Sequence, residues 1–203
     1  ESIASAICEV IAREGGQDWT VIGSCSGAAF ALFTALREKK SKCQGRIRRL
    51  VLLDPFASMP IYFRLFVPRN FAGVGRLLYK LSFANPVGRA MVNQALAGKR
   101  SDKTDLTRSF QGVNHDNTYD YLRILADSGS VDQFGELDIK TDIIIGGKSF
   151  NAVRQSARLF KKTIKDCRVH IVPQAGHLPL EESTTEVAQI IFSSSALYTV
   201  DKI

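Results

Sequence analysis

Three side chains with the chemistry of a covalent catalyst stand far apart in this sequence: Cys25, Asp54 and His177. Cys25 is the middle residue of Gly23-Ser24-Cys25-Ser26-Gly27, with an apolar run before it and small residues after it. This pattern predicts a strand, a tight turn and a helix, with the middle residue in strained backbone geometry and its side chain clear of the sheet. We expect both flanking glycines to be needed, because a Cβ there would collide with the neighbouring strand or helix.

A cysteine at the tip of such a turn is a candidate nucleophile. A thiolate attacks acyl carbon readily, and a nearby imidazole and a helix N-terminus both favour the thiolate. His177 is the candidate base, which takes the thiol proton and then protonates the leaving group. The backbone N–H of Ser26 is the candidate donor to the oxyanion. Because free cysteines are usually buried and inert, a packing role for Cys25 is the alternative.

The elements that must position these side chains follow from the apolar patterns. Strands are expected at 19–22, 47–53, 142–145 and 168–172, and helices at 1–15, 28–37, 151–163 and 184–192. This alternation predicts an α/β fold with a mostly parallel sheet and flanking helices. Ligands of such sheets bind beyond the carboxyl ends of the strands. Cys25, Asp54, Ser149 and His177 each follow a strand, so we expect them to meet at that edge.

Residues 56–138 differ in amino-acid composition from the rest of the chain. Aromatic and aliphatic residues crowd the first part of this segment, and prolines and glycines punctuate it. It is expected to be a helical cap insert, with residues 1–55 and 139–203 forming the core domain. The apolar side chains line an acyl pocket, form the core of the cap, or do both. We assign Phe56, Met59 and Phe63 to substrate binding and expect an apolar acyl substrate.

The sequence resembles the C-terminal portion of the α/β-hydrolase superfamily. The Gly-x-Cys-x-Gly turn is similar to the nucleophile elbow of that family. The stretch Val172-Pro173-Gln174-Ala175-Gly176-His177-Leu178-Pro179-Leu180-Glu181-Glu182 is similar to its histidine loop. The resemblance implies an α/β-hydrolase-like sheet that lacks the usual N-terminal strands, a cap insert, and acyl chemistry that needs no cofactor and no metal.

Two features depart from the pattern of the family. The loop after the third strand commonly reads Gly-x-x-Asp, but Gly146-Gly147-Lys148-Ser149 has no carboxylate. Some members place the acid after the preceding strand, where this sequence has Asp54. Asp54 is therefore the candidate acid, and the alternative is that Asp54-Pro55 only ends a strand and that no acid is present.

The second departure is upstream, where the family normally has several strands and a loop that supplies half of the oxyanion hole. The chain begins with Glu1 rather than Met, so it is interpreted as a processed form or a fragment, or else as a reduced version of the fold. An uncovered edge beside the strand of Cys25 would be exposed and apolar. We expect a partner chain, a second copy or the missing N-terminal segment to cover it.

Composition narrows the classes of function. The 203 residues are 45% apolar, which fits one globular domain with an insert. The net charge of +7 is scattered rather than arranged in a stripe with stacking aromatics, so no nucleic-acid partner is expected. The four cysteines lack metal-type spacing and are too sparse for a disulfide scaffold, which favours a reduced, cytoplasmic setting. No apolar run is long enough for a membrane span.

These patterns together predict an acyl hydrolase or acyltransferase that works through a covalent acyl-cysteine intermediate. Cys25 is the expected nucleophile, His177 the base and Asp54 the residue that orients the base. A thiol nucleophile favours thioester chemistry or acyl transfer over ester hydrolysis, because acyl exchange between sulfurs is energetically even. The alternative is a non-catalytic α/β-hydrolase-like subunit that binds or scaffolds and keeps the elbow only for packing.

Overall fold

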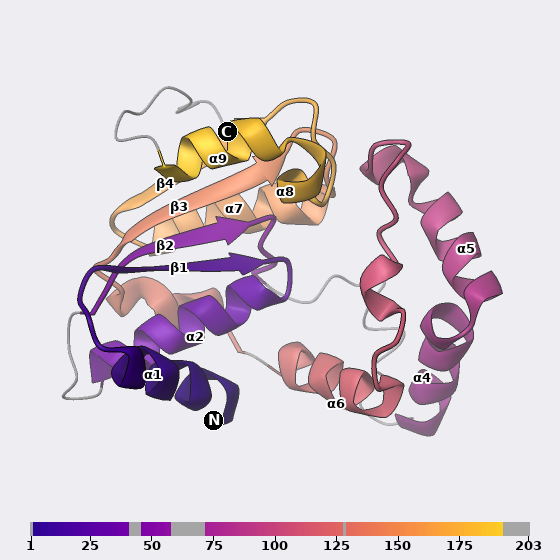
Figure 1. Cartoon of the computed structure of the whole chain (residues 1–203), viewed down its shortest axis with the longest axis horizontal. Coiled ribbons are helices and arrows are strands. Elements are labelled where there is room, and N and C mark those ends of the chain that lie inside the picture. The colour runs from indigo at the N-terminus through magenta and orange to yellow at the C-terminus, as the bar shows by residue number, and fades with distance from the viewer. Residues whose placement is uncertain (1, 41–45, 58–71, 128, 193–203) are drawn as a thin grey trace.

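The computed structural model describes residues 2–40, 46–57, 72–127 and 129–192, and its centre is one parallel sheet (Figure 1). The four strands lie in the order β1-β2-β3-β4. They are β1 (Trp19–Ser24), β2 (Ile47–Leu53), β3 (Lys140–Gly146) and β4 (Cys167–Val172). Every neighbouring pair is parallel, so the carboxyl ends of all four strands lie at the same end of the sheet, which we call its carboxyl edge. The α/β class predicted from the sequence is confirmed.

The two central strands are apolar because helices cover both of their faces. Leu50 and Leu52 of β2 face a core formed with α1 (Ser2–Glu14), α2 (Gly27–Lys40) and α7 (Asn151–Thr163). Val51 and Leu53 face the opposite core, which α9 (Thr184–Phe192) closes after the single turn α8 (Pro179–Glu182). Because both faces of β2 are buried, the sequence of β2 contains a continuous apolar run. Figure 1 shows α9 and α2 on opposite sides of the sheet.

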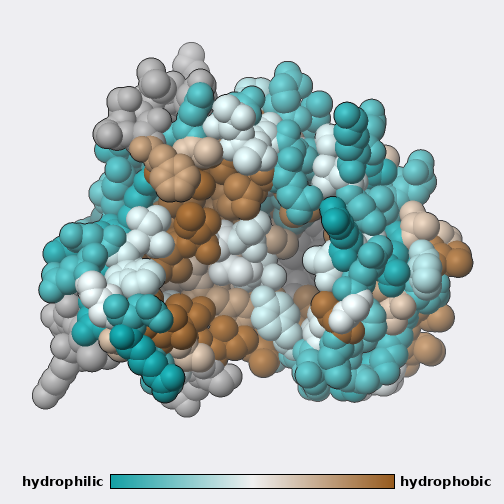
Figure 2. Space-filling view, viewed as in Figure 1, coloured by the Kyte–Doolittle hydropathy of each residue, from teal (hydrophilic) through white to brown (hydrophobic). Residues whose placement is uncertain are grey.

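β1 is an edge strand, as predicted, and among the described strands it pairs with β2 alone. Its burial alternates along the strand, and Ile22 keeps 47% of its surface exposed. Figure 2 shows apolar surface above and below this edge. That a further chain or segment covers the edge stays a prediction.

The segment between β2 and β3 contains the helices α4 (Ala72–Tyr79), α5 (Pro86–Ala95) and α6 (His115–Ala126). The π-helical turn Lys80–Ala84 follows α4, and the 3-10 turns are Ala97–Lys99, Arg108–Phe110 and Val131–Glu136. Figure 1 shows these three helices beside the ends of the strands toward which the arrows point. The predicted division into residues 1–55, 56–138 and 139–203 stays a prediction.

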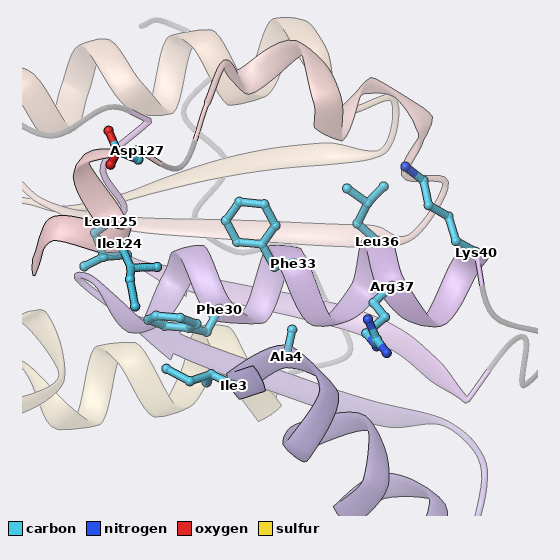
Figure 3. Close-up of a pocket in the computed structure, with 10 residues that line it drawn as sticks. All are labelled: Ile3, Ala4, Phe30, Phe33, Leu36, Arg37, Lys40, Ile124, Leu125 and Asp127. Atoms are coloured by element: carbon cyan, nitrogen blue, oxygen red, sulfur yellow. The ribbon is translucent and has the colours of Figure 1, made fainter. Parts of the chain in front are cut away.

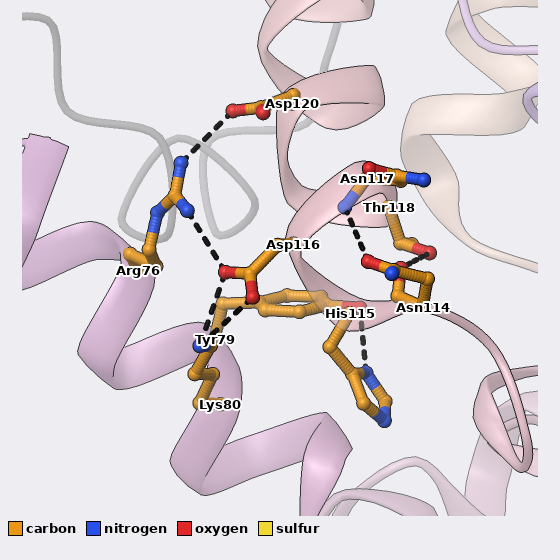
Figure 4. Close-up of polar contacts among 9 residues, drawn as sticks. All are labelled: Arg76, Tyr79, Lys80, Asn114, His115, Asp116, Asn117, Thr118 and Asp120. Atoms are coloured by element: carbon orange, nitrogen blue, oxygen red, sulfur yellow. Dashed lines mark hydrogen bonds and ion pairs between the residues drawn. The ribbon is translucent and has the colours of Figure 1, made fainter.

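A small aromatic core holds these helices together. Its buried side chains are Tyr79, Phe83, Tyr119 and Leu122. At the surface, Arg76 of α4 pairs with Asp116 and Asp120 of α6, and Lys80 also pairs with Asp116 (Figure 4). Exposed ion pairs are worth about 0–1 kcal/mol each. Burial of the aromatic rings therefore contributes more to the packing of α4 on α6 than these charges do.

Candidate active site

Cys25 lies at the tip of the turn between β1 and α2. Its φ of 51° lies in the left-handed region, which confirms the predicted strain. Its backbone N–H donates to the carbonyl of Leu53 at 2.8 Å, so the turn is fixed to the neighbouring strand. A Cβ on Gly23 would lie 2.6 Å from the carbonyl oxygen of Gly27, so this position requires glycine.

The prediction for the second glycine of the motif is wrong. A Cβ added to Gly27 would meet no atom within 4 Å, because its α-carbon faces open space rather than a neighbouring strand or helix. Only the glycine on the strand side of Cys25 is therefore required by close packing.

His177 joins the thiol to a buried carboxylate. Its Nε2 lies 3.3 Å from Cys25 Sγ, and its Nδ1 lies 2.9 Å from Asp54 Oδ2. Asp54 follows β2 and is fully buried. Its Oδ1 accepts a hydrogen bond of 2.8 Å from the N–H of Gly146, which holds the carboxylate in a fixed orientation. Asp54, assigned to orient the base, and His177, assigned as the base, therefore form one hydrogen-bonded chain with Cys25.

Ser149 occupies the position where the family pattern commonly has its acid. Its buried hydroxyl donates to Asp54 Oδ2 and lies 3.4 Å from His177 Nδ1. The expected meeting of four side chains at the carboxyl edge of the sheet is therefore confirmed. The serine hydroxyl supplies a further hydrogen bond to the carboxylate that contacts the histidine.

The environment of His177 favours its protonated form. Burial acts to lower the pKa of the imidazole, but the hydrogen bonds to Asp54 and Cys25, with the negative charges of both groups, raise the pKa of His177 to about 10. An imidazolium beside a sulfur stabilises the thiolate. Two aromatic rings flank the imidazole: Phe150 edge-on at 4.8 Å and Phe56 at 5.4 Å between ring centroids.

The loop that carries His177 is bound to the helical insert. The backbone N–H of His177 donates to the carbonyl of Lys99 at 2.8 Å. Glu182 Oε2 accepts from the N–H of Gly176 at 2.7 Å and from the N–H of Ser101 at 3.0 Å. A Cβ on Gly176 would lie 2.4 Å from the Lys99 oxygen, so a glycine before the histidine lets the insert approach this closely.

The predicted substrate residues are only partly within the described chain. Phe56 is half-buried and its ring lies beside that of His177, and its role in substrate binding stays a prediction. Met59 and Phe63 lie outside the described residues. Ser26 directly precedes α2, and its role as an oxyanion donor stays a prediction. Figure 2 shows the surface hollowed between the sheet and the insert.

Sequence reasoning missed one contact between the insert and the helix that follows Cys25. The ring of Tyr121 of α6 stacks on Phe30 of α2, with ring centroids 5.1 Å apart. The sequence shows Tyr121 as one of several aromatic residues in a helical segment. Nothing in that pattern distinguishes it from the tyrosines of the insert core.

A separate cavity of about 510 Å³ lies between α1, α2 and the end of α6 (Figure 3). It is lined by Ile3, Ala4, Phe30, Phe33, Leu36, Arg37, Lys40, Ile124, Leu125 and Asp127. None of these is Cys25, Asp54 or His177, so this cavity is distinct from the candidate active site.

A parallel sheet with a nucleophile elbow and a histidine loop at its carboxyl edge defines the class of α/β hydrolases. The chain belongs to the alpha/beta hydrolase family, whose model matches residues 1–190. A search of curated proteins found no significant sequence match. Among the described residues, no three side chains of suitable type are grouped to hold a metal ion. No helix in the described chain has the length and hydropathy needed to cross a bilayer.

Solved structures support the same fold. A lipase-esterase related protein from Clostridium acetobutylicum is 17% identical with a TM-score of 0.63, and the match covers 93% of this chain and 72% of that protein. An esterase from Exiguobacterium antarcticum is 16% identical with a TM-score of 0.69, covering 93% and 70%. A bromoperoxidase from Bacillus anthracis is 14% identical with a TM-score of 0.66, covering 93% and 71%. At these identities the likeness concerns the fold. Membership of the alpha/beta hydrolase family is what supports a hydrolase.

Proposed function

We propose that this protein is an acyl hydrolase that cleaves esters or thioesters through a covalent acyl-Cys25 intermediate. The observation that carries the proposal is the position of His177, which bridges the sulfur of Cys25 at 3.3 Å and the carboxylate of Asp54 at 2.9 Å. Membership of the alpha/beta hydrolase family supports the hydrolytic class of the reaction. The geometry supports the choice of nucleophile and base.

In the first half of the reaction, the thiol proton resides on His177 Nε2 and the thiolate of Cys25 attacks the acyl carbon. A carbon–sulfur bond forms, and the carbonyl π pair moves to oxygen to give an oxyanion. The N–H of Ser26 donates to this oxygen. The intermediate then collapses: the bond to the leaving group breaks, and the leaving group takes the proton from Nε2. Asp54 holds the Nδ1–H and stabilises the imidazolium.

In the second half, His177 is neutral and accepts a proton from water as the water oxygen attacks the acyl carbon. The carbon–sulfur bond breaks, the carboxylic acid leaves, and Cys25 returns to its starting state. Another thiol or alcohol in place of water gives acyl transfer. The aromatic rings of Phe56 and Phe150 beside the imidazole support an apolar acyl group.

We further propose that the insert acts as the cap of this site. The hydrogen bond from His177 to Lys99 and the stacking of Tyr121 on Phe30 support this role, because they join the insert to the histidine loop and to the helix after Cys25. A cap in this position separates the site from bulk solvent, which strengthens the electrostatic interactions of the oxyanion and the imidazolium.

The test is to incubate the protein with p-nitrophenyl esters and acyl thioesters of two to twelve carbons and to measure product and adduct mass. We expect an adduct of one acyl group on the peptide of Cys25, which is lost in Cys25→Ala. Cys167 is an internal control, since burial is the main reason that its pKa is raised to about 12. Absence of both turnover and adduct in the wild type would overturn the proposal and favour a non-catalytic binding subunit.

A further inference from the structure

We propose that one face of the helical insert binds the surface of an anionic lipid bilayer. The face is formed by α4, the π-helical turn after it and α5, and we call it the outer insert face. Large apolar side chains are exposed on it: Val74, Leu77, Leu78, Leu81, Val87 and Met91. Binding of this kind goes beyond the proposed function and does not depend on the chemistry of Cys25.

These elements of the insert are apolar on two sides. On the inner side, Tyr79 and Phe83 are buried, and Val92 packs against them. On the outer side, the six apolar side chains each keep between 41% and 69% of their surface exposed. Those from Val74 to Leu81 recur at three- and four-residue steps, which places them on one helical face. A surface helix normally presents polar side chains to water, so a second apolar face of this size indicates an interaction surface.

The apolar residues of α4 and α5 are joined into one surface at Leu81. Asn85 Nδ2 donates to the carbonyl of Leu81 at 3.1 Å, which holds the start of α5 against the turn after α4. A Cβ on Gly88 would overlap the same carbonyl oxygen, so this glycine lets α5 pass directly beside Leu81. Figure 2 shows apolar atoms along the outer edge of the insert, where Figure 1 places α4 and α5.

The charge of this region favours an anionic partner. No Asp or Glu occurs between Asp54 and Asp102, whereas Lys and Arg occur seven times in the same stretch. Within residues 72–95, the charged residues are Arg76, Lys80 and Arg89, and the net charge of the whole chain is +7. An apolar helical face bordered by cations is typical of segments that lie in the headgroup region of anionic bilayers.

A bilayer fits the outer insert face better than a second copy of the chain does. In a two-fold dimer the same patch meets itself, so its cations would face cations. Asp116 of α6 already pairs with Arg76 and Lys80 of its own chain (Figure 4), and α4 and α5 carry no carboxylate. An anionic bilayer instead supplies phosphate groups for the cations and hydrocarbon for the leucines.

Flotation of the full chain with lipid vesicles tests the proposal. Vesicles of phosphatidylcholine and phosphatidylglycerol, in a ratio of about 2:1, should bind roughly tenfold more tightly than phosphatidylcholine alone. Leu77→Glu with Met91→Glu should lower the affinity by roughly a hundredfold, because it removes two inserted apolar groups and adds repulsion by the headgroups. The uncharged pair Leu77→Gln with Met91→Gln should lower it by roughly tenfold. Cys25→Ala should bind like the wild type, since the thiol takes no part.

Val10→Glu with Leu159→Glu is the matched control, since it makes the same change of charge at exposed apolar residues of α1 and α7. It should retain most of the affinity, and thermal unfolding should show that all variants are folded. Equal losses in the two glutamate pairs would overturn the inference, because net charge alone would then control binding. Loss of binding in Cys25→Ala would also overturn it and would assign lipid binding to the candidate active site.

Two further results would contradict lipid binding by the outer insert face. One is a wild type that does not float with anionic vesicles. The other is a lipid-free dimer that Leu77→Glu with Met91→Glu dissociates, measured by analytical ultracentrifugation, which would assign the face to a second copy. Acylation of Cys25 by water-soluble esters is measured without vesicles, so the proposed function stands or fails separately.

Discussion

Cys25 and Asp54 share an unusual backbone conformation at the ends of adjacent strands. Their φ angles are 51° and 46°, and neither residue is glycine. Such conformations cost about 1–3 kcal/mol each and persist where the surroundings impose them. The backbone N–H of Cys25 is held by Leu53, and that of Asp54 by Ile144. The turn of the chain at each strand end directs both side chains toward His177, which lies between them.

At the scale of single residues, the contact of His177 Nε2 with Cys25 Sγ at 3.3 Å predicts how thiol reactivity depends on the imidazole. Because the pKa of His177 is raised to about 10, the imidazolium is present from low pH up to about that value. This cation favours the reactive thiolate, so the wild type should be alkylated at Cys25 by iodoacetamide at pH 6.5. In His177→Ala the rate at pH 6.5 should fall by about tenfold or more, because the neighbouring cation is gone. His115→Gln, in the insert, is the control, and equal rates in wild type and His177→Ala would contradict the assignment.

Asp54→Asn should lower kcat by about 10²–10⁴ with a small effect on KM, because an amide no longer fixes the Nδ1–H of His177 or stabilises the imidazolium. Ser149→Ala should lower kcat less, by about tenfold, since it removes only one hydrogen bond of the carboxylate. Steady-state kinetics of the two variants measure the order of these effects. A larger loss in Ser149→Ala than in Asp54→Asn would show that the serine, not the carboxylate, orients the histidine.

At the scale of elements, the two glycines of the elbow should differ sharply. Gly23→Ala places a Cβ 2.6 Å from a backbone oxygen, and overpacking of this kind costs about 1–3 kcal/mol. Gly27→Ala meets open space and should change the free energy of unfolding by less than about 1 kcal/mol, in either direction. Urea unfolding of both variants measures the difference. Equal destabilisation would mean that the backbone conformation of the turn, rather than close packing around Gly23, explains why glycine is needed.

A buried network ties three strands together at some distance from Cys25. Asp142 of β3 pairs with Arg49 of β2 at 2.7 Å and with His170 of β4 at 2.8 Å. Arg49 also donates to the carbonyls of Ile190 and Ile191 at the end of α9. This guanidinium therefore joins the sheet to its last described helix.

Asp142→Asn tests the contribution of this network to stability. Burial raises the pKa of Asp142, but hydrogen bonds from His170 and Arg49 outweigh it, so the folded pKa lies below the unfolded value of 3.8. The stabilisation is thus present above about pH 4 and is lost as the pH falls through the folded pKa. Asp142→Asn should lower the free energy of unfolding by about 1–3 kcal/mol at pH 7. The difference from wild type should narrow at pH 3 and below, as urea unfolding at both pH values will measure. A constant difference would exclude the charge as its cause.

At the scale of the whole molecule, a single carboxylate joins the histidine loop to the insert. Glu182 accepts hydrogen bonds from Gly176 and from Ser101, which lie on opposite sides of this contact. Glu182→Ala should lower kcat by about tenfold or more, because small displacements of a catalytic group are costly. The neighbouring Glu181→Ala, at an exposed position, is the matched control. If both variants keep wild-type kcat, the contact is not needed to position His177.

Much of this architecture was predictable because the apolar and glycine patterns of short segments indicate the same strands and turns that the folded chain contains. The continuous apolar run of β2 and the Gly-x-Cys-x-Gly turn predicted the strands, the elbow and the edge at which Cys25, Asp54 and His177 meet. Asp54 came from the resemblance to the family, since spacing alone does not separate an acid from an Asp-Pro strand end. The contact partners of Ser149 depend on three loops that meet only in the folded chain.

The contribution of the insert was the least predictable part of the site. Tyr121 of α6 stacks on Phe30 of α2, and this contact joins segments that are far apart in the sequence. The error at Gly27 has a similar cause, because open space next to a residue is a property of the neighbours and not of the motif.

The hydrogen bond from the amide of His177 to Lys99 also makes that amide a reporter. Its proton cannot exchange with solvent while the insert is seated on the histidine loop, and it is released when the two separate. Deuterium exchange at this one amide would therefore record how often the insert lifts from the histidine, on the timescale of local opening and without any substrate. Comparison of that opening rate with kcat would show whether movement of the insert limits turnover.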